Sequence, residues 1–158
     1  MFSTIKKFFE ERLSFDSGEG DEQHHRKIEF ASAALMYELM KTDSRVDERE
    51  ELMLRQVLAD TFSLDKANVN DIVTLAEKAS HDATSLYEFT ALVNAHYSYE
   101  DRVLLIENLW RVAFSDFALD RYEEHLIRKV GDLIYIKHSD FIKSKLKVKE
   151  SLGMGGQN

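Results

Sequence analysis

Acidic residues recur at matching positions in two segments of the chain. Residues 43–57 read DSRVDEREELMLRQV and residues 116–130 read DFALDRYEEHLIRKV, so the second segment repeats the first. Both carry the pattern Asp-x-x-x-Asp-x-x-Glu, and carboxylate oxygens are the ligands that Ca²⁺ and Mg²⁺ prefer in proteins. The spacing therefore indicates a divalent-cation site, and its candidate ligands are Asp43, Asp47, Glu50, Asp116, Asp120 and Glu123.

Helix capping explains part of the same pattern without any ion. Asp47 and Asp120 each precede a Glu by three residues, as in a capping box, where the Asp accepts a hydrogen bond from the third helical amide. Asp43 and Asp116 need another explanation, because each is expected at the C-terminal end of a helix, where the helix dipole disfavours an anion. The pattern lacks the ligand spacing and central glycine of an EF-hand. A structural turn and a cation site therefore both stay open.

Other motifs give no indication of catalysis. The sequence contains no P-loop, no dinucleotide-binding glycine pattern and no nucleophile motif. Glu22-x-x-His25 is half of a di-iron carboxylate motif, but it has no second copy. We therefore expect a protein that is not an enzyme. A metal-dependent hydrolase built on the same repeated acids is the third class of function.

The composition favours a helical protein without disulfides. The 158 residues include no proline, no cysteine and six glycines, five of which lie outside residues 21–150. A formal net charge of −8 argues against nucleic-acid binding. The lack of cysteine and of any membrane-spanning stretch fits a cytoplasmic protein.

Apolar periodicity predicts an all-α fold, a single compact helical domain of two pseudo-repeated three-helix units with about seven to eight helices. Residues 1–20 are expected to form an amphipathic N-terminal helix and a linker, 21–150 the helical domain, and 151–158 a disordered tail. Within the domain, helices are predicted at about 22–42, 47–61, 65–80, 85–96, 98–115, 120–136 and 139–150. The helices at 22–42 and 98–115 are expected to be central and buried, with Tyr37 and Trp110 as equivalent core residues.

The first thirteen residues carry an apolar stripe among charged residues. Phe2, Ile5, Phe9 and Leu13 have the spacing of one helix face. Such a helix could dock on the domain, lie on a membrane surface or pair with a second chain.

Several blocks of the sequence resemble the tellurite-resistance TerB-like family. They are residues 39–50, 109–113, Asp116, Asp120, 122–128 and 136–141, and the resemblance covers about residues 25–148. It implies an all-helical domain with clustered acids at the two repeated loops that bind a divalent metal. It also implies an association with tellurite resistance and chemical stress, with links to the membrane and to partner proteins. The second loop departs from the family's typical Asp-Gly, since it reads Asp116-Phe117.

Two functions follow as expectations. The first is a non-enzymatic interaction module in which Ca²⁺ or Mg²⁺ at the acidic loops changes a surface for an unknown protein partner. The alternative is a purely structural scaffold or adaptor that binds a partner or a membrane surface through its N-terminal helix or a helical groove. Peripheral membrane association and self-association stay open in both, and nucleic acid is not an expected partner.

Overall fold

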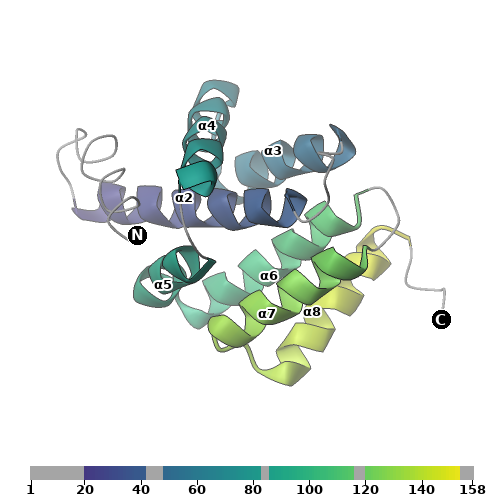
Figure 1. Ribbon diagram of the computed structural model, residues 1–158. Coiled ribbons are helices and arrows are strands. Elements are labelled where there is room, and N and C mark those ends of the chain that lie inside the picture. The colour runs from purple at the N-terminus through teal and green to yellow at the C-terminus, as the bar shows by residue number, and fades with distance from the viewer. Residues whose placement is uncertain (1–19, 42–47, 83–85, 116–119, 154–158) are drawn as a thin grey trace.

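A computed structural model describes residues 20–41, 48–82, 86–115 and 120–153 of the chain (Figure 1). Within these ranges the chain forms seven α-helices and no β-strand, so the predicted all-α fold class is confirmed. The helices are α2 (Gly20–Met40), α3 (Glu48–Phe62), α4 (Lys66–Asp82), α5 (Leu86–His96), α6 (Tyr99–Ala113), α7 (Arg121–Leu133) and α8 (His138–Ser151). Among the described residues, no helix has both the length and the apolar character needed to cross a membrane.

The predicted helix bounds agree with these to within three residues. The helix expected at residues 1–13 and the linker after it lie outside the described residues, as do residues 154–158 of the expected tail. At the start of that tail, α8 continues through Ser151, and Leu152 packs against the core. The folded domain therefore extends slightly beyond residue 150.

The largest difference in bounds is at the end of α7, which stops at Leu133 although a helix to residue 136 was predicted. Tyr135 adopts a left-handed conformation with a φ of 61°. The amide of Ile136 then donates to the carbonyl of Gly131 at 2.9 Å, and the amide of Tyr135 donates to Asp132 at 3.2 Å. These are the two bonds of a Schellman motif, which ends a helix. No glycine marks this stop in the sequence, so periodicity alone missed it.

Side-chain caps begin two of the helices, at the residues where the sequence predicted these helices to start. Ser98 Oγ accepts a hydrogen bond from the amide of Asp101 at 3.1 Å, at the start of α6. Asp65 Oδ1 accepts from the amide of Asn68 at 2.8 Å, at the start of α4. Each cap contributes about 1 kcal/mol.

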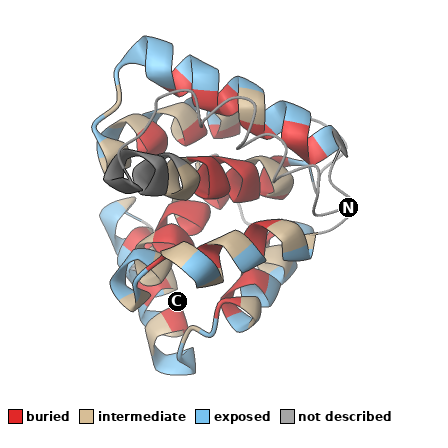
Figure 2. Cartoon of the chain, turned by 90° about the vertical axis from the view of Figure 1, so that its left-hand side faces the viewer, coloured by how far each residue is buried: buried red, intermediate tan, exposed pale blue. Residues whose placement is uncertain are grey.

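Helix α2 lies across the middle of the molecule, with α3 and α4 on one side and α5, α6 and α7 on the other (Figure 1). Neighbours on several sides explain why its central part is apolar nearly all round. Figure 2 shows this stretch as buried. Its fully buried apolar residues are Phe30, Ala31, Ala33, Ala34, Leu35, Met36, Leu39 and Met40.

Helix α6 is the second packing centre, in contact with α7 and α8 as α2 is with α3 and α4. This pairing of helices is the one expected if residues 31–42 correspond to 104–115. Whether the two three-helix units have the same three-dimensional arrangement stays a prediction.

Trp110 on α6 is fully buried and forms the core between α6 and α8. Its ring stacks on Phe114 at 5.5 Å between centroids and meets Phe141 edge-on at 5.6 Å. Gly131 permits this arrangement, because a Cβ there would lie 3.0 Å from Phe141 Cδ1. Tyr37, the counterpart of Trp110 in the repeat, is only partly buried. The two residues are therefore not equivalent in the core.

Helix α5 joins the two predicted units and also packs extensively on α2. Phe89 is fully buried, and its ring meets Phe30 edge-on at 6.3 Å. Asn94 Nδ2 donates to the carbonyl of Leu133 at the end of α7, at 3.0 Å. Because α5 contacts both α2 and α7, it is an integral part of the core rather than only a connection.

Candidate functional site

Three of the six predicted cation ligands lie among the described residues. Glu50 is in the first turn of α3, Asp120 directly precedes α7, and Glu123 is in the first turn of α7. Asp43, Asp47 and Asp116 fall outside the described residues, so their arrangement relative to these three stays a prediction.

Glu50 and Glu123 are buried, with exposed fractions of 5% and 2%. They occupy the same position of the sequence repeat, at the starts of two different helices. A glutamate is rarely removed from water unless hydrogen-bond donors or a positive charge compensate it. The capping-box interpretation places such a Glu in the first helical turn, but it does not predict burial. Capping alone therefore does not account for the burial of a glutamate at this position in both repeats.

Asp120 is the N-cap of α7, with an extended backbone. Its Oδ1 accepts a hydrogen bond from the amide of Tyr122 at 2.6 Å. The cap was predicted, but the bond goes to the second helical amide rather than to the third, that of Glu123. One oxygen of an ionised carboxylate can cap a helix while the other binds a cation, because the group has about four acceptor sites. The cap at Asp120 is thus compatible with a ligand role.

The carboxylate side chains at these helix starts suit a hard divalent cation, because carboxylate oxygens are its usual protein ligands. No three His, Asp or Glu side chains gather as a ligand set within the described part of the chain. A cation at the start of α3 or α7 would therefore take further ligands from residues 42–47 or 116–119, where the remaining predicted acids lie.

The residues directly after Glu50 and Glu123 are also glutamates, Glu51 and Glu124, and both form ion pairs at the surface. Glu51 Oε2 lies 3.3 Å from Arg55 Nη2. Glu124 Oε2 lies 4.0 Å from Arg128 Nη2 and 2.8 Å from Lys145 Nζ. Partly exposed pairs of this kind contribute about 1 kcal/mol or less. These ion pairs join residues within one helix or link α7 to α8. Neither Glu51 nor Glu124 was among the predicted ligands.

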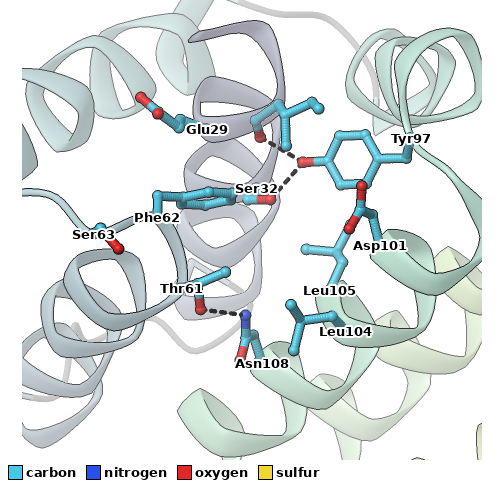
Figure 3. A pocket seen from close by; sticks show the side chains of 11 residues that line it. Glu29, Ser32, Thr61, Phe62, Ser63, Tyr97, Asp101, Leu104, Leu105 and Asn108 are labelled. Carbon is cyan, nitrogen blue, oxygen red and sulfur yellow. Dashed lines mark hydrogen bonds between the residues drawn. The ribbon is translucent and has the colours of Figure 1, made fainter. Parts of the chain in front are cut away.

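A pocket of about 320 Å³ lies between α2, α3 and α6, and the sequence did not predict it (Figure 3). Its apolar lining residues are Ile28, Phe62, Leu104 and Leu105. The polar ones are Glu29, Ser32, Thr61, Ser63, Tyr97, Asp101 and Asn108. None of the described lining residues is Lys or Arg, so the pocket combines an apolar interior with two carboxylates.

Hydrogen bonds between distant segments hold the pocket walls together. The hydroxyl of Tyr97 donates to the carbonyl of Ile28 on α2, and Ser32 Oγ therefore donates to that hydroxyl (Figure 3). On the opposite wall, Asn108 Nδ2 donates to Thr61 Oγ1 at 3.0 Å and ties α6 to α3. Burial raises the pKa of Tyr97 above its ordinary value of 10.0.

Two of these residues had a signal in the sequence. Ser32 interrupts the apolar run of the first central helix, and the repeat aligns it with Leu105. Asn108 interrupts the second, and the repeat aligns it with Leu35. A polar residue at a position where the other repeat is apolar and buried could have indicated a specific hydrogen bond.

Replacing Tyr97 with Phe is expected to lower the free energy of unfolding by about 1–2 kcal/mol at pH 7. The reason is that the change removes the donor to Ile28 and the acceptor for Ser32. Because the folded-state pKa is raised, the unfolded chain loses the Tyr97 proton first as the pH rises past 10.0. The stabilisation from the neutral hydroxyl is complete below that pH and is lost above it.

Urea unfolding at pH 7 and pH 11 tests this expectation. The stability difference between the natural protein and Tyr97→Phe should narrow at the higher pH. A difference that stays constant or grows would show that the buried hydroxyl does not titrate as proposed.

Comparison with known proteins gives one match. The family model described as tellurite resistance protein TerB matches residues 29–146, from the middle of α2 into α8. No curated protein and no solved structure matches the chain.

Proposed function

The chain belongs to the tellurite resistance protein TerB family, and on that premise we propose that it is a non-enzymatic, cation-responsive interaction module in the response to tellurite and related chemical stress. Ca²⁺ or Mg²⁺ is the proposed ion, at the acidic starts of α3 and α7. The observation that carries the proposal is the burial of Glu50 and Glu123 at the same position of both repeats.

A divalent cation next to a buried carboxylate would offset the cost of removing that charge from water. In the first repeat the proposed ligands are Asp43, Asp47 and Glu50. Carboxylates that share one ion site would repel one another when the ion is absent, since like charges at short distance disfavour the ionised forms. Ion binding would therefore stabilise the passage from α2 into α3, and the second repeat would act in the same way between α6 and α7.

This mechanism links the ion to a protein surface. The central helices α2 and α6 each lead into one of the acidic segments, and α3 also packs directly on α6. Fixing the start of α3 would thus restrict its position against α6. The proposed partner is a protein that recognises the ion-bound arrangement, with the module in the cytoplasm and any membrane association peripheral.

Thermal unfolding at constant ionic strength tests ion binding directly, with chelator compared against millimolar Ca²⁺, Mg²⁺, Mn²⁺ and Zn²⁺. An ion present at about 100 times its dissociation constant should add about 2.7 kcal/mol, which raises the Tm by several degrees in a domain of this size. A shift that is the same for every ion and for added monovalent salt would indicate screening alone.

The double variant Asp43→Asn with Asp116→Asn is expected to lose the ion-dependent Tm shift. Its Tm in chelator should equal or exceed that of the natural protein, because repulsion among the remaining carboxylates is reduced. Each change removes one proposed charged ligand and keeps the side-chain shape. The matched control is Asp60→Asn with Asp71→Asn, which removes two charges from exposed positions of α3 and α4 and should keep the shift. An unchanged shift in the first variant would exclude these aspartates as ligands.

The alternative function is a structural scaffold or adaptor, and the pocket between α2, α3 and α6 is the observation that favours it. In that case the acids at the helix starts act as caps, as Asp120 does in α7. The same thermal measurements separate the two functions, because a scaffold should show no ion-selective change in Tm.

A further inference from the structure

We propose that the pocket between α2, α3 and α6 is the docking site of the chain's own residues 2–13. This inference is independent of cation binding. It rests on the chemistry of the described pocket walls, on the amino-acid sequence of the segment, and on the short stretch of chain that connects the two.

The pocket presents apolar surface and two carboxylates, a lining that suits an occupant with both apolar and positively charged side chains. Phe62, Leu104 and Leu105 supply apolar surface. The carboxylates of Glu29 and Asp101 come from different helices and lie at opposite sides of the pocket in Figure 3. The volume, about 320 Å³, is at the lower end of ligand-sized pockets. A few large side chains are a suitable filling for such a space.

The segment has the matching pattern. Phe2, Ile5 and Phe9 share one face at helical spacing. At about 100° per residue, Lys6 and Arg12 fall about 60° to either side of that face. The segment thus has an apolar stripe with one cation along each edge, and the pocket has apolar walls with one carboxylate on each side. The two patterns are complementary.

The connecting chain, residues 14–19, can reach the pocket and still keeps the segment close to it. Residues 14–19 can span at most about 20 Å. Along α2, Ile28 and Ser32 lie about 12 and 18 Å from Gly20. A short tether of this kind gives an effective concentration on the order of millimolar. Docking within one chain is therefore favoured over docking between two copies in dilute solution.

Disulfide trapping in the 158-residue chain tests the contact, and the absence of cysteine from this sequence gives a clean background. The test pair is Ile5→Cys with Leu104→Cys, which joins the segment to the pocket wall. The control pair is Ile5→Cys with Leu146→Cys, because Leu146 is exposed on α8, which does not line the pocket. With oxidised glutathione as the oxidant, the test pair is expected to form an intramolecular disulfide at least ten times faster than the control pair.

A charge exchange tests the two edges of the stripe. Adding Lys6→Glu and Arg12→Glu to the test pair should slow trapping several-fold. Adding Glu29→Lys and Asp101→Lys to that variant should restore the rate, which a general effect on folding or thiol reactivity would not do.

The products are read on non-reducing gels, with mass spectrometry of the linked peptides. Equal rates in the test and control pairs would overturn the inference, because they indicate random contact. Disulfide-linked dimers would replace it with docking between two copies. No disulfide in either pair would leave the pocket for an external ligand or partner and would equally overturn the inference.

Discussion

Replacing Trp110 with Ala is expected to lower the free energy of unfolding by about 3–5 kcal/mol, the usual cost of removing a large buried aromatic side chain. The side chain is fully buried, and its ring contacts Phe114, Phe141 and the ammonium group of Lys145, whose Nζ lies 5.3 Å from the ring centroid. The cavity would lie between α6 and α8. Since small domains are stable by about 5–15 kcal/mol, a large part of the total would be lost.

Urea unfolding followed by circular dichroism measures this loss, and Tyr37→Ala is the matched control. The repeat aligns Tyr37 with Trp110, but Tyr37 is only partly buried. Its replacement is expected to cost about 1–2 kcal/mol, within the range of ordinary substitutions. Equal losses at both positions would mean that the core depends on the two repeats alike, contrary to the difference in burial.

Replacing Phe89 with Ala is the second change with a large expected effect, again about 3–5 kcal/mol. Phe89 fixes α5 to α2 through its edge-on contact with Phe30. Because α2 contacts helices on both of its sides, loss of this contact should destabilise the whole domain. We expect one cooperative transition at lower urea concentration, with no separate early unfolding of α5.

Tyr87→Ala is the control on the same helix. Tyr87 is 58% exposed, so its replacement should change the free energy of unfolding by only about 0.5 kcal/mol. A small effect of Phe89→Ala as well, or a separate transition for α5, would show that this helix is only a connection between two independently stable units.

Features of the site that depend on residues close together in sequence could be predicted, whereas features that depend on helix packing could not. Capping depends on residues that are neighbours in sequence, so the helix starts at Asp65 and Ser98 and the cap at Asp120 could be predicted. The acidic pattern was also visible, because it repeats. The burial of Glu50 and Glu123 was not, because it depends on which way the helix starts face once they pack.

The pocket depends on contacts between residues that are far apart in sequence. Thr61 and Asn108 are 47 positions apart, and Ser32 and Tyr97 are 65 apart. Helical periodicity places Ser32, Thr61 and Asn108 on three different helices and Tyr97 between two helices. It contains no information on how one helix crosses another. These pairs therefore could not be assigned before the packing was known.

Sequence patterns were sufficient to predict the all-α class, most helix bounds and the buried character of the two central helices, and they also contain the repeated acids. These properties follow from local periodicity, composition and capping chemistry. Three features became visible once the helices were packed: Trp110 and Tyr37 differ in burial, α5 belongs to the core, and a pocket lies between α2, α3 and α6. These features depend on how the side-chain shapes of several helices fit together at once, and a helix's own sequence does not specify its neighbours.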